Sequence, residues 1–489
     1  MYLRLYLAPV LRRWLTPIAW VAAVSAVLLV VFPVGFPNYD TIYALVWGRE
    51  LAHGVSPDYG AALPPTPHPL ADLLGTVTTP LGNGAIDVTM VIAYLSLGLI
   101  GYLVYRLGAL WFDRPIGAVA ALIVLTRAPY LSNGLRAYVD LPYIALCLGA
   151  LAIETKRPRA GWPVLTLLAL AGLLRPEAWG FAIAYWLWLA LDYRGGLRWR
   201  RERSSGELAW LGILALAGPI LWLLFDGITT GSFLYSLTGT QETVETLKRR
   251  TGPVDLVLYG PRALGEVLQW PGMVGAAGGV VLAFAFLRHR AALGLVATIL
   301  ALAAFAFLAA AGLAIIARYT MLGAALLAIF VAVALLGWRL LEDGHPWRLR
   351  WQIFAGIVLL MFVLWLPNQW DLDSTVHRDL SNQGAIERDL TNLVDAGAFA
   401  KPLCGPVAVP NHRAIPRLAF GLDVRPTRIV SASEEKGIPR RGYFLDPAGP
   451  FVIHNFILDP NDRTRFSLVP PHGFGRMARN DSWILYRRC

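Results

Sequence analysis

Long apolar runs separated by short basic segments are the feature that most constrains how this chain folds. Residues 18–36 form one such run, and others recur as far as about residue 366. An apolar segment of about 18 or more residues is long enough to cross the hydrocarbon core of a bilayer as a helix. Since 56% of the residues are hydrophobic and only 15% are charged, we expect a polytopic α-helical membrane protein.

The net charge of +11 does not indicate a nucleic-acid partner. The arginines and lysines lie mainly in short loops on one expected side of the membrane, rather than in one stripe with interleaved aromatic residues. This is the positive-inside pattern, and such clusters also meet anionic lipid headgroups. The first apolar run is long and lacks a small-residue cleavage site, so we expect an uncleaved helix rather than a signal peptide.

The apolar pattern predicts about eleven spans, and their odd number puts the two ends of the chain on opposite sides. With the positive-inside rule, the N-terminus lies in the cytoplasm and the C-terminal tail outside the cytoplasmic (inner) membrane. The expected spans are residues 14–35, 86–108, 115–131, 137–153, 161–173, 178–191, 207–225, 272–287, 291–316, 320–337 and 351–366.

Two domains follow from this topology. A transmembrane domain covers residues 1–366 and has two long outside loops, 35–85 and 226–271. A polar tail, residues 367–489, follows it on the outside. The tail is large enough for a small extracytoplasmic α/β domain.

An acid stands where the chain leaves the first expected helix, in the sequence Asn38-Tyr39-Asp40. A carboxylate at a membrane boundary is costly unless it has a partner or a function. One interpretation makes Asp40 a general base at the outer face of the membrane. The other makes it the N-cap of a short amphipathic helix, beginning at Thr41 and lying in the interface. The two interpretations are compatible.

Further polar candidates lie at the expected outer ends of the helices. Arg175 with Glu177 suits a phosphate-binding arginine held by an acid, or an ion pair at a helix break. Arg318 with Tyr319 suits a contact to a lipid-linked phosphate, or a snorkelling anchor. Arg127 lies at about the same level.

Two more residues have weaker signals. His68, in PPTPHPL, suits substrate binding or proton transfer, or is an ordinary loop histidine. Asp140, in RAYVDLPY, opens a helix from the outside and suits either a site or a cap. The sequence contains no zinc, haem or P-loop pattern, so we expect no bound metal and no cofactor.

The tail has several runs with the character of strands: GPVAVP, RIVSAS, PFVIHNFIL and SWILYRR. It also contains Cys404 and the last residue, Cys489. Outside the cytoplasm a disulfide is permitted, and we expect one because a terminal strand needs to be held in place. Two free thiols are the alternative. We interpret the arginines of the tail as a solvated face, namely Arg413, Arg417, Arg440 and Arg441.

These features together resemble the GT-C superfamily of integral-membrane glycosyltransferases. The resemblance rests on the acid that opens the first outside loop, on YVDLPY, LLRPE and ARYTMLGAALLAI, and on the soluble outside tail. It is greatest to the glycosyltransferase family 39-like branch and to actinobacterial transferases that use polyprenyl-phosphate sugars. It covers most of residues 1–340 in architecture, but only short motifs in sequence.

The resemblance implies a hexosyl- or pentosyltransferase in the bacterial cell envelope. The donor would be a polyprenyl-phosphate sugar, the acceptor an envelope glycan, glycolipid or protein, and the outcome inversion. It implies Asp40 as the base, and it places Asp140, Arg318 and Tyr319 near the donor. Many relatives have a second adjacent acid, which this chain lacks.

Glu50 or Asp58 would have to supply that second acid here. Three other functions remain open. A transporter or lipid flippase would need charges near mid-helix and matched halves, neither of which the sequence shows. A non-catalytic envelope scaffold would use only the tail. A related GT-C enzyme would transfer a polymer from a lipid-diphosphate donor.

Overall fold

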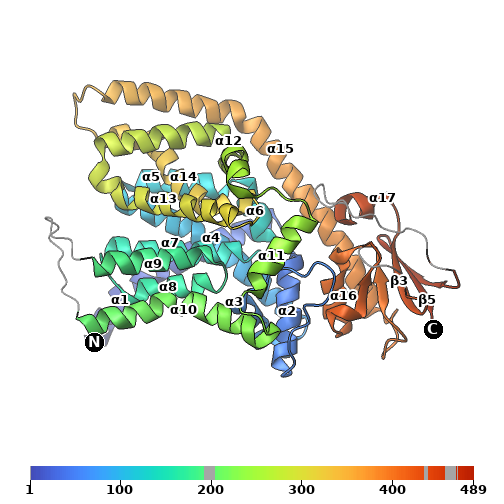
Figure 1. The fold of residues 1–489 in the computed structure, drawn as a ribbon. Helices are drawn as coiled ribbons and strands as arrows, with labels where there is room; N and C mark the ends of the chain where they lie inside the picture. Colours follow the sequence, from blue (N-terminus) through green and yellow to red (C-terminus); the bar gives the residue numbers. More distant parts are fainter. Residues whose placement is uncertain (1, 192–203, 434–438, 458–469, 471) are drawn as a thin grey trace.

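The structure is a computed structural model, and it describes residues 2–191, 204–433, 439–457, 470 and 472–489. A helical bundle fills most of the molecule, and a small sheet lies at one end (Figure 1). The first helices are α1 (Tyr2–Val31), α2 (Tyr39–Ala52), α3 (Pro69–Thr78), α4 (Gly84–Trp111), α5 (Arg114–Leu125), α6 (Ala128–Leu135), α7 (Asp140–Lys156), α8 (Trp162–Gly172) and α9 (Glu177–Ala190). The later ones are α10 (Ser205–Thr230), α11 (Tyr235–Thr246), α12 (Gly252–Phe286), α13 (Arg288–Ala310), α14 (Met321–Leu336) and α15 (Arg348–Asp395).

Helix α14 forms the centre of the bundle. It is apolar on all sides, and every residue from Met321 to Ala334 is buried. Helices α5, α12, α13 and α15 pack around it. Close packing depends on small residues: a Cβ added at Gly279 of α12 would overlap the carbonyl oxygen of Phe330.

The structure does not confirm the expected count of eleven membrane spans. Among the described residues, six helices are long and apolar enough to cross a membrane, or seven if the bent pair α5–α6 is one span. The expected helix 115–131 bends there by 60°. Arg127 has an extended backbone (φ −82°, ψ 123°) and Pro129 follows closely. A proline has no backbone N–H and its ring clashes with the carbonyl four residues earlier, so Pro129 fits the first turn of a new helix rather than the interior of a continuous one.

The second expected outside loop, 226–271, is mostly helical in the structure. Helix α10 continues to Thr230, α11 follows, and α12 begins at Gly252. The expected start of the next span at residue 272 nevertheless lies close to a break inside α12. There Gln269 has φ 60° and ψ 160°, directly before Trp270 and Pro271.

The first outside loop contains α2, where a helix was expected, but α2 is not amphipathic. Its residues from Thr41 to Gly48 are buried on every side. It packs between α3, which the sequence did not predict, and the tail helix α16 (Ile415–Leu422). The backbones of α2 and α3 approach so closely that a Cβ at Gly48 would overlap Gly75.

Helix α15 joins the bundle to the tail (Figure 1). The expected span ended at residue 366, whereas the helix continues through Pro367 to Asp395. Its second half is amphipathic, because Leu380, Ile386, Leu390 and Leu393 recur at helical spacing and are all buried. Leu380 packs in the core of the bundle, whereas Ile386, Leu390 and Leu393 pack in the core that includes the tail, and this burial keeps the polar segment helical beyond residue 366.

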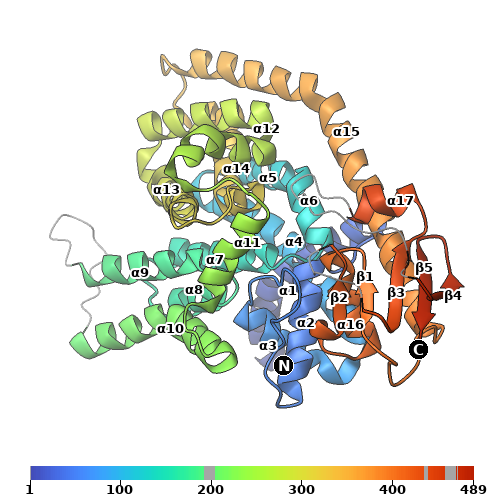
Figure 2. The same cartoon turned by 45° about the vertical axis from the view of Figure 1, so that its right-hand side comes forward.

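The tail contains one five-stranded mixed sheet in the order β2-β1-β3-β5-β4 (Figure 2). Strand β1 is parallel to β2 and β3, and β5 is antiparallel to β3 and β4. The strands are β1 (Val407–Val409), β2 (Ile429–Ser431), β3 (Gly442–Pro447), β4 (Gly475–Arg479) and β5 (Trp483–Arg488).

Three of the four expected strand runs are confirmed, at β1, β2 and β5. The fourth, PFVIHNFIL, is wrong: residues 450–457 form a short helical segment that includes α17 (Pro450–Val452). Strands β3 and β4 were not predicted. A disulfide joins Cys404 to Cys489 with a Cα–Cα distance of 5.7 Å. It ties the end of β5 to the segment that precedes β1.

Candidate active site

A cavity of about 1430 Å³ opens between the bundle and the tail. One part of its wall is apolar and comes from the first half of α9 and the second halves of α10 and α13. The opposite part is polar and comes from α2, the segment between α6 and α7, α15 and the tail. Seven of the eight site residues predicted from the sequence line it: Asp40, His68, Asp140, Arg175, Glu177, Arg318 and Tyr319.

Asp40 lies in the first turn of α2 but does not cap it. The N-cap is Asn38, whose side chain accepts a hydrogen bond from the Thr41 amide at 3.1 Å. Asn38 also donates from Nδ2 to the Arg136 carbonyl at 2.8 Å. The capping interpretation of Asp40 is therefore wrong, because Asn38 already fills that role. The Asp40 carboxylate is left to face the cavity.

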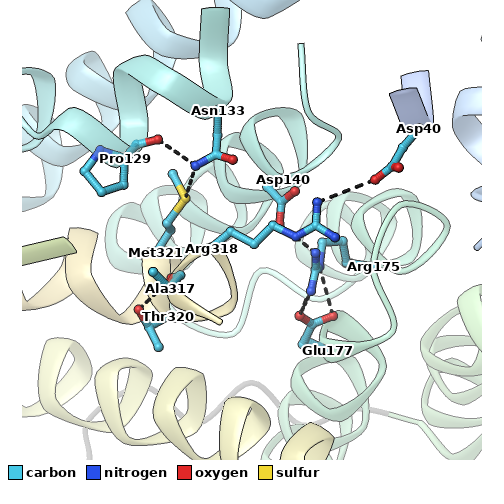
Figure 3. Close-up of polar contacts among 10 residues, drawn as sticks. All are labelled: Asp40, Pro129, Asn133, Asp140, Arg175, Glu177, Ala317, Arg318, Thr320 and Met321. Carbon is cyan, nitrogen blue, oxygen red and sulfur yellow. Dashed lines mark hydrogen bonds and ion pairs between the residues drawn. The ribbon is translucent and has the colours of Figure 1, made fainter. Parts of the chain in front are cut away.

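The partner of Asp40 is Arg318, in the short 3-10 turn η2 (Ala317–Thr320) before α14. Arg318 Nη1 lies 3.5 Å from Asp40 Oδ2, and each side chain is 23% exposed (Figure 3). The guanidinium also lies over the rings of Tyr138 and Tyr319, at 5.0 and 5.4 Å from their centroids. The ion pair is long and open to the cavity, so a ligand is able to compete for either member.

Arg175 lies in a different environment. Its Nη1 donates to Asp140 Oδ1 at 2.6 Å, and its Nε and Nη2 donate to Glu177 Oε1 at 3.0 and 2.6 Å (Figure 3). All three side chains are buried. Two carboxylates share one guanidinium, so this triad has a net negative charge and Arg175 has little capacity left for an anion. The face of Arg175 is covered by Tyr319, whose ring centroid is 4.1 Å away.

The Tyr319 ring therefore contacts both arginines. An aromatic face attracts a cation, so the ring lets two guanidinium groups approach each other without direct contact. Asp140 and Glu177 supply the opposing charge on one side and Asp40 on the other. Residues from α2, α7, α9 and η2 thus converge, although they are far apart in the sequence.

His68 lies at the N-terminus of α3, and its ring meets Trp222 edge-on at a centroid distance of 5.7 Å. Burial lowers the pKa of His68 to about 3, and the positive charge of Arg175 acts in the same direction. The imidazole is therefore neutral at physiological pH. It offers an apolar edge and a hydrogen-bonding nitrogen, but no positive charge.

Two predictions about which residues lie at the site differ from the structure. Arg127 does not line the cavity, and its Nη2 donates to Thr126 Oγ1 at 3.3 Å. Glu50 and Asp58 do not supply a second acid beside Asp40. They lie at the other end of α2, where both approach Arg425, at 3.5 and 3.6 Å.

The sequence analysis missed several residues of the polar wall. Arg136 and Tyr138 stand in RAYVDLPY, the segment that we singled out for Asp140 alone. Arg413 was assigned to a solvated face, and this is wrong because it lines the cavity. No local sequence pattern predicts that these side chains line a cavity, because the wall forms only when the tail packs on the bundle. Other polar lining residues that were missed include Gln383, Glu387 and His412, and Lys248, Arg249 and Arg250 near the apolar side.

Within the described ranges, no group of three or more His, Cys, Asp or Glu side chains is arranged to hold a metal ion. The charges that face the cavity are those of arginine, lysine and carboxylate side chains. Such a lining suits a ligand that contains both an anion and hydroxyl groups.

No protein-family model matches the chain, and no curated protein matches it. Solved structures do. ArnT from Cupriavidus metallidurans bound to undecaprenyl phosphate aligns with 97% of this chain and 98% of its own, at 14% identity and a TM-score of 0.57. The same protein in the apo state covers 96% and 97%, at 16% identity and a TM-score of 0.56. The likeness thus extends over nearly the whole of both chains.

Proposed function

We propose that this chain, which has the GT-C fold of ArnT, is a membrane glycosyltransferase. It moves a sugar from a polyprenyl-phosphate donor to a hydroxyl of an envelope acceptor, at the outer face of the inner membrane. The observation that carries the proposal is the Asp40–Arg318 ion pair, whose two side chains are partly exposed at the wall of a large cavity. The match to a structure that contains undecaprenyl phosphate supports the class of donor.

The cavity has a suitable place for each part of such a donor. The apolar wall on α13 suits an isoprenoid chain, and it includes Leu300, Ala303, Ala304, Phe307 and Leu308. The phosphate would bind at Arg318, whose ion pair is long and partly exposed. Arg175 is the weaker candidate, because Asp140 and Glu177 already occupy its donors.

The reaction uses Asp40 as a general base. Asp40 takes the proton of the acceptor hydroxyl as that oxygen bonds to the anomeric carbon of the donor sugar. The bond from this carbon to the phosphate oxygen breaks, and the electron pair leaves with the polyprenyl phosphate. Arg318 stabilises the negative charge that develops on the phosphate oxygen as this bond breaks. Attack from the face opposite the leaving group inverts the anomeric configuration.

The proposal needs no resident cofactor. Arginine supplies the positive charge that the leaving phosphate requires, and the lipid-linked sugar is a substrate. The tail would lie outside with the active site, and the N-terminus inside.

The test compares wild type with Asp40→Asn after reconstitution into vesicles with radiolabelled polyprenyl-phosphate mannose or arabinose and candidate acceptors. We expect Asp40→Asn to lower the transfer rate by about 10²–10⁴-fold, the usual contribution of a general base. Undecaprenyl phosphate should bind the variant at least as well, because a competing negative charge is gone. The matched control is Asp87→Asn, an exposed acid in the first turn of α4 that does not line the cavity.

Full activity of Asp40→Asn would rule out Asp40 as the base. Movement of lipid or solute across the vesicle membrane, without sugar transfer by the wild type, would favour a transporter instead.

A further inference from the structure

A second cavity, of about 320 Å³, lies between α11 and the loop that follows α2 (Figure 1). We call it the side pocket. One of its walls is the proline-rich segment of residues 59–67, and the other is a face of α11. The rings of Tyr59 and Tyr235 meet across it at a centroid distance of 5.2 Å. Its volume is at the lower end of the range for small-molecule sites, so it suits one part of a larger ligand.

Helix α11 lies between the side pocket and the main cavity. Glu242 and Thr246 line only the side pocket, whereas Val244 lines only the main cavity. Opposite faces of one helix therefore point into the two spaces. Thr240 and Thr243 line both, so the two spaces adjoin along this helix.

The loop wall of the side pocket is held against the proposed reacting centre. Tyr39, the neighbour of Asp40, donates from its hydroxyl to the Leu63 carbonyl at 3.0 Å. Leu63 has φ 47°, which is uncommon outside glycine, and this hydrogen bond helps to hold that backbone in place. Leu63 and Thr66 line both spaces. A ligand whose hydroxyl reaches Asp40 is therefore able to continue along this loop into the side pocket.

The α11 wall of the side pocket offers hydrogen-bond acceptors. The hydroxyl groups of Thr238, Thr240 and Thr243 each donate to the backbone carbonyl four residues earlier in the helix. A hydroxyl has one hydrogen, so these side-chain oxygens are left to accept. The Glu242 carboxylate is exposed at the pocket and also only accepts. This wall therefore favours a ligand that donates several hydrogen bonds.

The charge and the aromatic rings of the side pocket narrow the class of ligand. In the part of the chain that the structure describes, no arginine, lysine or histidine lines it, and Glu242 forms no ion pair. Burial raises the pKa of Tyr235, and the negative charge of Glu242 adds to this effect, so the two side chains lie near each other. An anionic ligand is disfavoured here. A neutral sugar fits, because its edges carry hydroxyl donors and its C–H faces pack on aromatic rings.

We infer that the acceptor is a glycan of at least two sugar residues, and that the side pocket binds a neutral sugar residue next to the one whose hydroxyl reaches Asp40. This inference rests on the proposed function and chooses one chemical class of acceptor for it. It makes Glu242 and Tyr235 specificity-determining residues, which recognise the acceptor away from the reacting bond.

The test measures binding without a donor, so it does not depend on turnover. The full chain in lipid nanodiscs is titrated with octyl mono- and disaccharides, in one series of mannose and one of arabinose. We expect the second sugar residue to tighten binding by about 10-fold in at least one series, which corresponds to one or two net hydrogen bonds.

Glu242→Leu should remove most of this gain and leave the affinities for the monosaccharide and for undecaprenyl phosphate unchanged. Tyr235→Leu should do the same, whereas Tyr235→Phe, which keeps the ring, should retain most of the gain. Glu245→Leu is the matched control, because Glu245 is an exposed acid of α11 that lines neither space.

Equal affinity for the mono- and disaccharide in both series would overturn the inference. So would a gain that survives both Glu242→Leu and Tyr235→Leu. Tighter binding of a lysine-containing tripeptide than of either disaccharide would also overturn it, because the side pocket would then hold a peptide. Length-dependent glycan binding by a wild-type chain that transfers no sugar would instead overturn the proposed function, and the side pocket would remain a glycan site.

Discussion

Two arginines that line the cavity, Arg175 and Arg318, both form ion pairs with carboxylates, but they differ in burial and in how fully their donors are occupied. Arg175 is buried, and its donors are occupied by Asp140 and Glu177 at 2.6–3.0 Å. Arg318 is partly exposed and has one carboxylate, Asp40, at 3.5 Å. A buried and satisfied charge stabilises one arrangement of helices, whereas an open and weakly paired charge is available to a ligand. The sequence motifs LLRPE and ARYT do not reveal this difference.

The largest expected effect is on stability. Arg175→Gln leaves two buried carboxylates without their cation, and breaking a buried ion pair typically costs about 3–5 kcal/mol. We expect a large fall in the free energy of unfolding, measured by thermal denaturation in detergent. Arg175→Lys, which keeps the charge but loses the planar fork, should be intermediate. A stable Arg175→Gln variant with weakened donor binding would reverse the roles of the two arginines.

Arg318→Gln should have the opposite signature. We expect the rate of sugar transfer to fall by about 10²–10³-fold, as for the loss of one group that stabilises the charge of the transition state. The free energy of unfolding should change by less than about 1 kcal/mol, since a long and partly exposed ion pair contributes little. Measuring both quantities on one preparation separates the two arginines. A variant that unfolds readily but retains its transfer rate would contradict the assignment.

The last prediction concerns a carboxyl group that has no such cation among the described residues, and its effect appears only when the pH is changed. Asp446, in β3 of the tail, is buried, and its Oδ1 has no hydrogen-bond partner in the part of the chain that the structure describes. Burial raises its pKa from 3.8 to about 7. The folded form therefore keeps a proton that the unfolded form loses, and stability falls as pH rises between these values. The slope is at most about 1.4 kcal/mol per pH unit.

Asp446→Asn should remove this pH dependence and make the tail more stable than the wild type above pH 7. Thermal unfolding of both proteins at pH 5 and pH 8 measures the difference. An unchanged pH dependence in the variant would show that Asp446 is not its source.

Much of the architecture follows from local patterns. Apolar runs located the helices of the bundle, and β-branched runs located β1, β2 and β5. The errors have physical causes. Pro129 broke a helix that was expected to be continuous, and the polar second half of α15 stayed helical through Pro367 because its apolar stripe packs on the bundle and on the tail.

For the site, the sequence identified the residue types but not their roles. Asp40 and Arg318 were singled out separately, yet they are 278 positions apart and only the fold pairs them. Asn38 proved to be the cap of α2, which leaves Asp40 to the cavity. Arg136 and Arg413 were missed because a solvated arginine and an arginine that lines a cavity look the same in a sequence.

The sequence by itself determined the membrane class, the positions of most helices, the presence of a folded tail and the candidates Asp40, Arg175 and Arg318. These depend on hydropathy and on residue type, which are local properties. Only the tertiary structure decided which arginine is satisfied, which acid faces the cavity and how the tail completes its wall. These depend on burial and on distances between distant segments, which arise only when the helices pack.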